Sequence, residues 1–113
     1  MSQNRLREFE ELVLLSVLIA SPEAYGAALQ EVLAREAGRE VSLGAIYTAL
    51  DRLGTKGLVV SELGDPTPVR GGRRKRHYEL TPEGLEHVKE ARRVRERMWD
   101  KVAPDVLDGE VVS

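Results

Sequence analysis

The hydrophobic period changes twice along this chain, and the order of the changes limits the folds that it can adopt. Three segments before residue 57 carry apolar residues every three to four positions, the spacing of amphipathic helices. Residues 58–63, LVVSEL, are strand-like, and residues 73–80, RRKRHYEL, resume as a strand after a turn-rich stretch. The helical period returns from residue 82 to about residue 102. The sequence therefore predicts a mainly α protein with one strand pair, in the order α-α-α-β-β-α.

The first helix, residues 6–20, is expected to be buried on more than one side. Its apolar face is broad, and in a chain of 113 residues, about one domain, we expect the second side to contact another subunit. Its longest apolar run, LVLLSVLIA, is roughly half of a membrane span and follows acidic residues, where a secretory signal would be basic. We therefore expect no membrane segment and a cytoplasmic location.

The second and third helices are predicted from their start and stop signals. Ser21 as N-cap, with Pro22 at the first helical position, predicts a helix that stops at Gly38. Ser42 as N-cap predicts the next helix, residues 42–56, with Gly57 as its stop.

The third helix has two distinct faces. Its outward residues, which include Gly44 and Thr48, are small and uncharged for about a turn and a half, whereas a solvated face would carry more Glu and Lys. We therefore expect this face to approach a flat or grooved partner. The inward stripe is formed by Leu43, Ile46, Leu50 and Leu53.

Thr81 as N-cap, with Pro82 at the first helical position, predicts the last helix, residues 82–102. This helix carries an apolar stripe longer than a small domain can cover by itself. We therefore expect the first and last helices to form a dimer interface. The predicted contacts are Leu6, Phe9, Val13, Val94, Met98, Trp99 and Val102.

Charge is segregated along the chain. The formal net charge is −2, yet residues 42–78 hold seven basic and three acidic residues, a local net charge of +4. Five of the seven positions in 70–76 are Arg or Lys, directly behind a glycine pair. A basic middle with acidic flanks favours a face that binds a polyanion. Chance clustering, a solvated hairpin and a nuclear targeting signal are the alternatives for this run.

The order of elements is that of a winged helix-turn-helix domain, in which the second helix of the motif enters the DNA major groove. The helix at residues 42–56 takes that place here, and the basic hairpin at residues 64–76 is the wing. The groove is about 12 Å wide and admits a helix, while basic wing residues can follow the phosphate backbone. Strict alternation directs Arg73, Lys75 and His77 outward and turns Arg74 and Arg76 toward the body.

Five segments together resemble the PadR family of bacterial transcriptional regulators, in its short form with a single C-terminal helix. They are FEELVLLSVL, AYGAALQEVL, SLGAIYTALDRLGTKGLVVSEL, GGRRKRHYELTPEG and RERMW. The resemblance implies a homodimer that represses promoters containing its operator. We expect a DNA-binding domain at 1–81, a dimerisation helix at 82–103 and an acidic flexible tail at 104–113. The DNA contacts that the resemblance implies are Ser42, Gly44, Tyr47, Thr48, Arg52, Arg73, Arg74 and Lys75.

Several other roles can be weighed from the residues. In some short members of that family, aromatic residues on the last helix bind flat apolar compounds, so Trp99 is a candidate for effector binding, with packing as the alternative. For Tyr47, core packing competes with a phosphate contact.

The chain has no cysteine, and its two histidines lack metal-ligand spacing, so we expect no metal or other cofactor. Glu83, Glu86 and Glu90 alternate with basic residues as on a solvated helix, so we expect no enzyme.

A protein-binding adaptor is the alternative function from another class. A winged helix can dock a protein instead of DNA, and the sequence alone does not distinguish the two. Salt-dependent binding to random duplex DNA separates them.

Overall fold

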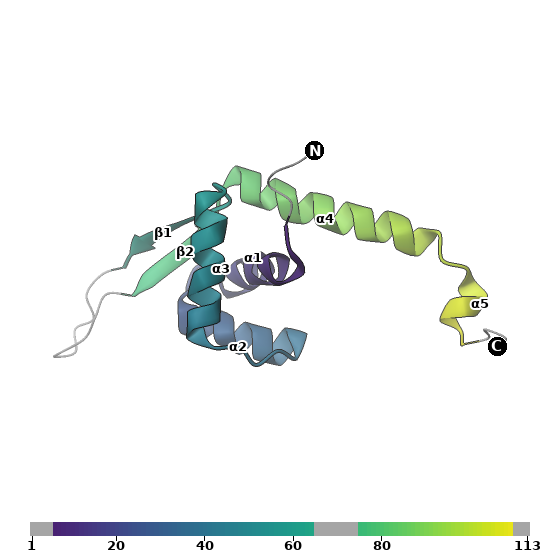
Figure 1. Ribbon diagram of the computed structural model, residues 1–113, viewed down its shortest axis with the longest axis horizontal. Coiled ribbons are helices and arrows are strands. Elements are labelled where there is room, and N and C mark those ends of the chain that lie inside the picture. Colours follow the sequence, from purple (N-terminus) through teal and green to yellow (C-terminus); the bar gives the residue numbers. More distant parts are fainter. Residues whose placement is uncertain (1–5, 65–74, 110–113) are drawn as a thin grey trace.

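The computed structural model describes residues 6–64 and 75–109. Three helices pack together, a two-stranded sheet follows, and a long helix leads away from this body (Figure 1). The predicted element order and the winged helix fold are confirmed. The elements are α1 (Glu8–Ala20), α2 (Gly26–Ala37), α3 (Leu43–Thr55), β1 (Val59–Leu63), β2 (Arg76–Leu80), α4 (Pro82–Asp100) and the short α5 (Pro104–Leu107), which lies in the segment predicted to be a tail.

The core lies between α1, α2 and α3 and is closed by the sheet and by the start of α4. Leu14, Leu29 and Leu53 are fully buried there, and Tyr78 of β2 and Val88 of α4 complete it. Burial of each large aliphatic side chain contributes about 1.5–3 kcal/mol, so this cluster supplies most of the stabilisation. Leu43 is an exception to the predicted inward stripe: it is exposed, because the first helical residue lies beyond the edge of the core.

Two of the predicted helix starts are confirmed by their caps. The Ser42 Oγ accepts the backbone N–H of Ala45 at 3.1 Å, and the Thr81 Oγ1 accepts that of Gly84 at 3.0 Å. These bonds satisfy donors that lack a partner in the first turn. At the end of α3, Gly57 has a φ of +76°, a left-handed conformation that glycine adopts without strain.

The predicted start of the second helix is wrong. Ser21 ends α1 instead, with its N–H bonded to the carbonyl of Val17 at 3.0 Å, and Glu23 N–H bonds to Ala20 in a turn. Ser21 and Pro22 are thus used to redirect the chain, and α2 begins four residues after Pro22, with Tyr25 as its N-cap residue.

The helix α4 extends from the body (Figure 1), and only Gly84 and Val88 of it are buried. The radius of gyration is 17.4 Å, against about 13 Å for a compact chain of this length. The start of α4 lies close to the segment that joins α3 to β1: a Cβ on Gly84 would lie 2.0 Å from the carbonyl oxygen of Leu58. Among the described residues, no helix is long and apolar enough to cross a membrane.

Candidate nucleic-acid interface

The outward face of α3 is formed by side chains that its packing leaves exposed. Ile46, Ala49, Leu50 and Leu53 are buried, so the opposite side, with Gly44, Thr48, Asp51, Arg52 and Thr55, faces away from the core. The Ser42 hydroxyl caps the helix with its oxygen lone pair, which leaves its proton available to a phosphate or base acceptor. Gly44, Thr48 and Thr55 are small residues, so much of this face is formed by short side chains. Asp51, which the sequence analysis did not select as a contact, lies on the side of this face that borders β1 and β2.

Tyr47 is at the edge of this face and packs on α2. A Cβ built on Gly26 would lie 2.3 Å from the phenolic oxygen of Tyr47, so the ring rests on the glycine backbone. The side chain is nevertheless exposed. Packing is thus shown for Tyr47, and its contact with DNA remains a prediction.

One face of the hairpin lies beside α3. Ser61 of β1 pairs with Tyr78 of β2, which is buried. Arg76 shares the side of the strand with Tyr78, and its Nη1 donates to the Ser61 Oγ at 2.9 Å. A hollow of about 420 Å³ separates this face from α3, with Asp51 and Thr55 on the helical side and Arg76 on the other.

The same neighbours affect Tyr78. Burial is the main cause that raises the pKa of its phenol above the ordinary value, with Tyr47 and Asp51 acting in the same direction. The guanidinium of Arg76 opposes this shift. The electrostatic coupling is consistent with one cluster at the junction of α3 and the hairpin.

The other face of the hairpin docks on the start of α2. The His77 ring makes an edge-to-face contact with Tyr25, with 4.7 Å between centroids, and Lys75 Nζ lies 4.8 Å from the same ring. The backbone N–H of Tyr78 donates to Ala24 at 3.1 Å. His77, which alternation directs outward, is therefore half-buried, while Lys75 stays exposed beside the N-terminus of α2.

A second hollow, of about 340 Å³, flanks α3 on the side of α1. Arg7, the N-cap residue of α1, lies here together with Thr48 and Arg52 of α3. The sequence analysis did not select Arg7, and it placed Arg76 in the basic wing but turned toward the body, because only the tertiary packing brings the two residues beside α3. Arginines from α1, α3 and β2 thus border the outward face of α3 on both sides.

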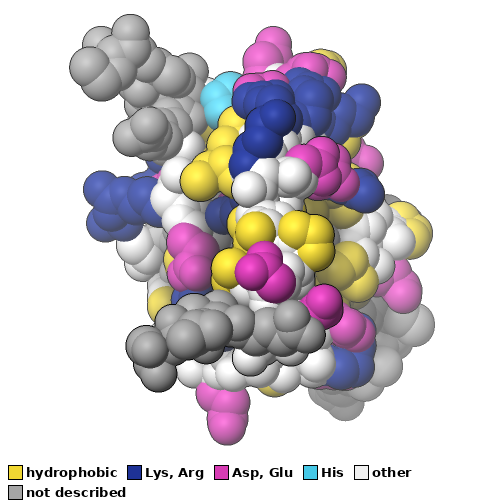
Figure 2. Space-filling view, turned by 90° about the vertical axis from the view of Figure 1, so that its right-hand side faces the viewer, with side chains coloured by type: hydrophobic (Ala, Val, Ile, Leu, Met, Phe, Trp, Pro, Cys, Tyr) yellow, Lys and Arg dark blue, Asp and Glu magenta, His cyan; other side chains and the backbone are white. Residues whose placement is uncertain are grey.

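An apolar groove lies between α1 and α4. It has a volume of about 380 Å³ and is lined by Leu15, Leu18, Leu85, Val88 and Trp99, with Glu11 and Arg95 at its edge. Trp99 is 61% exposed and Met98 is 68% exposed. Figure 2, which faces the end where α4 and α5 lie, shows hydrophobic side chains exposed among charged ones.

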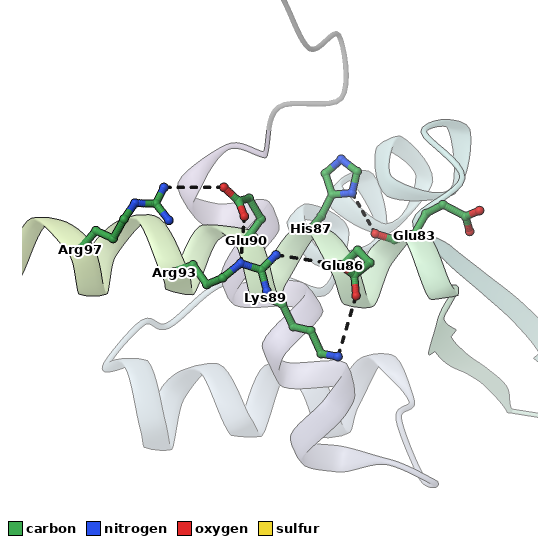
Figure 3. A network of polar contacts seen from close by, with 7 residues as sticks. All are labelled: Glu83, Glu86, His87, Lys89, Glu90, Arg93 and Arg97. Carbon is green, nitrogen blue, oxygen red and sulfur yellow. Dashed lines mark hydrogen bonds and ion pairs between the residues drawn. The ribbon is translucent and has the colours of Figure 1, made fainter.

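Another face of α4 is a ladder of ion pairs (Figure 3). Glu90 pairs with Arg93 at 3.0 Å and with Arg97 at 3.8 Å, and Glu86 pairs with Lys89 at 3.8 Å and with Arg93 at 3.9 Å. These carboxylates are exposed and neutralised by basic neighbours, as predicted for a solvated face. Within the described ranges, no three His, Cys, Asp or Glu side chains gather so as to hold a metal ion.

The geometry agrees with a family match. The transcriptional regulator PadR-like family matches residues 14–90, more than half of the chain. The chain belongs to the PadR-like family. Its members are transcriptional regulators, which agrees with the expectation that this protein is not an enzyme. Among curated proteins, none matches the chain.

Solved structures of PadR-like regulators have the same fold. One from hypervirulent Clostridium difficile R20291 is 27% identical with a TM-score of 0.63, and covers 88% of this chain and 98% of its own. One from Bacillus cereus is 26% identical with a TM-score of 0.63, and covers 93% of each chain. One from Eggerthella lenta is 27% identical with a TM-score of 0.61, and covers 79% of this chain and 74% of its own.

The predicted contacts of this PadR-like protein are distributed as follows. Gly44, Thr48 and Arg52 share one exposed side of α3, and Ser42 is exposed at its N-cap, while Arg73 and Arg74 lie outside the described residues. Val94, Met98 and Trp99 are exposed on α4, and Leu6, Phe9 and Val102 are half-buried. The prediction of Val13 as a dimer contact is wrong, because its side chain is 0% exposed within the core of the protomer.

Proposed function

We propose that this PadR-like protein is a sequence-specific DNA-binding repressor that inserts α3 into the major groove of its operator. The observation that carries the proposal is the placement of arginines on both sides of a small, exposed helical face. A helix in the groove has a phosphate backbone on each side. Arg7 and Arg52 suit one backbone, and Arg76 suits the other. Gly44 and Thr48 leave the space for base edges.

The wing supplies further phosphate contacts in this proposal. Arg73, Arg74 and Lys75 follow the backbone beyond the edge of the groove, and each neutralised phosphate releases counterions. Lys75 is also beside the N-terminus of α2, where the helix dipole favours an anion. The wing then gives affinity and register, and α3 gives sequence preference.

The protein acts as a cytoplasmic homodimer in this proposal. The exposed Val94, Met98 and Trp99 of α4 support an interface with the same helix of a second copy and with its α1. Two-fold symmetry would set the half-sites about 34 Å apart, one helical turn of DNA.

The groove that Trp99 lines is the proposed site for a flat apolar effector. Its apolar lining from α1 and α4 supports stacking with such a ligand. Binding there would alter the surfaces that form the dimer. Quenching of Trp99 fluorescence on titration with planar hydrophobic dyes tests this role, and unchanged emission would contradict it.

The decisive experiment is a salt titration of binding to duplex DNA, followed by selection of bound sequences from a random library. We expect affinity to fall steeply between about 50 and 200 mM salt. Selection should enrich one symmetrical sequence. Absence of binding at low salt would refute the regulator and favour the protein-binding adaptor. Arg52→Ala on α3 should weaken this binding, and Arg93→Ala, changed within the exposed ladder of α4, serves as its charge-matched control.

A further inference from the structure

Two consecutive buried carboxylates on α1 hold two different elements. Glu10 is 2% exposed, and its Oε1 lies 2.7 Å from Lys56 Nζ at the C-terminal end of α3. Glu11 is 7% exposed and accepts a hydrogen bond from Arg95 of α4. Adjacent residues of a helix point about 100° apart, because one turn holds about 3.6 residues. One turn of α1 therefore reaches both α3 and α4.

Lys56 lies where α3 passes into the hairpin. It is the C-cap residue of α3, and β1 begins at Val59. The N-cap residue of α4 binds the same junction: the Thr81 hydroxyl donates to the carbonyl of Gly57 at 2.7 Å, and the Thr81 N–H donates to that of Leu58 at 3.0 Å. The junction is thus held by α1 through Glu10 and by α4 through its first residues.

These ion pairs specify geometry more strongly than apolar contacts would. A buried carboxylate pays for desolvation, and an apolar pair of similar volume often stabilises a fold as well or better. The Glu10 Oε2 is buried without a hydrogen-bond partner in the described part of the chain. A shift of α1 against α3 or α4 would leave a buried charge unpaired, so each pair favours one arrangement.

We propose that Glu10 and Glu11 are positioning residues that tie the direction of α4, and with it the dimer, to the placement of α3. The inference rests on the proposed function, because it takes α3 as the helix that reads DNA. In this proposal, a displacement of α4 moves Arg95, which pulls on Glu11 and turns α1. The turn of α1 moves Glu10 and with it Lys56 at the end of α3. The input to this coupling is the binding of a partner that changes the direction of α4.

The first test needs no DNA. Backbone amide spectra of Arg95→Met are compared with those of Arg93→Met, a matched change within the exposed ladder. We expect Arg95→Met to shift the resonances of residues 52–60, although Arg95 itself binds α1. Shifts confined to α1 and α4 would overturn the proposal, whether or not the protein binds DNA. Glu11→Gln, which keeps an acceptor for Arg95, repeats the comparison if Arg95→Met does not fold.

The second test measures discrimination, the ratio of affinities for the selected operator and for random duplex. Glu10→Gln and Glu11→Gln should each lower this ratio about tenfold, within the usual range for coupling between sites. The salt slope should not change, because neither side chain contacts phosphate. Glu90→Gln, the control on the exposed side of α4, should stay within about twofold. Unchanged discrimination in folded Glu11→Gln would overturn the coupling, whereas failure of the native protein to bind any duplex would refute the proposed function instead.

Discussion

The ring of Tyr47 on α3 rests on the backbone of Gly26 at the start of α2. A Cβ at position 26 would lie 2.3 Å from the phenolic oxygen and 2.6 Å from Cζ, closer than real carbon contacts allow. The pair therefore sets the distance between the two helices of the helix-turn-helix motif. Tyr47, at the edge of the proposed DNA-binding face, is thus positioned by its contact with the backbone of Gly26.

Replacement of this glycine should destabilise the fold. We expect Gly26→Ala to lower the free energy of unfolding by about 0.5–1.5 kcal/mol, because the Tyr47 ring must leave its preferred rotamer to make room for the methyl group. In a Tyr47→Ala background the same glycine substitution should cost little, because the ring that it would contact is absent. Gly54→Ala is the control: its nearest atom is 3.9 Å away, so alanine should stabilise α3 by about 0.5–1 kcal/mol. Urea denaturation measures all of these, and a stabilising Gly26→Ala would contradict the contact.

A larger loss is expected at Gly84. Its Cβ would lie 2.0 Å from the carbonyl oxygen of Leu58, and this obstacle is backbone, which cannot rotate away as a tyrosine ring can. Gly84→Ala should cost about 3 kcal/mol or more, since α4 must separate from the junction after α3. Thermal unfolding monitored by circular dichroism checks this, and a Tm equal to that of the native protein would show that the approach is not so close.

The sequence could predict what depends on local pattern. The caps at Ser42 and Thr81 were predicted correctly because an N-cap bond joins residues only three apart. The same kind of signal at Ser21 gave a wrong prediction. The Ser21 N–H bonds to the carbonyl of Val17, so this residue ends α1 instead of starting α2. Val13 was assigned to an interface because a stripe shows which side is apolar, not what covers it. The positions of Arg7 and Arg76 beside α3 could not be predicted from local pattern, because contacts between residues far apart in the sequence bring them there.

Stability should depend on pH through Glu10. Burial raises the pKa of this carboxyl, but the hydrogen bonds from Lys56 and from the Arg7 amide outweigh it, so the net pKa lies below the ordinary 4.5. Since the folded-state pKa is depressed, the stabilisation is complete above about pH 4.5 and is lost as the pH falls through the folded value. Glu10→Gln should remove this part of the acid loss. Lys56→Met should raise the pKa and make the loss smaller, and urea unfolding between about pH 3 and 6 measures both. If the native protein, Glu10→Gln and Lys56→Met lost the same free energy of unfolding at low pH, Glu10 would be excluded as the source of that loss.

Arg76 should contribute to DNA binding independently of sequence. Arg76→Ala should weaken binding to operator and random duplex alike and reduce the salt slope by about one phosphate contact. Arg93→Ala removes the same charge from the exposed ladder of α4 and should leave the slope unchanged. Fluorescence anisotropy at several salt concentrations gives the slopes. A loss of discrimination without a change in slope would assign Arg76 to base recognition instead.

Met98 tests the proposed interface. It is 68% exposed in the protomer, and burial against a second copy would place a carboxylate at this position in an apolar contact. Met98→Glu should weaken dimerisation at least about 100-fold, because an unpaired buried charge costs several kcal/mol. Ala34→Glu adds the same charge to an exposed position of α2 and should leave dimerisation unchanged. Sedimentation equilibrium distinguishes the two, and a Met98→Glu protein that remains as dimeric as the control would place the interface elsewhere on the chain.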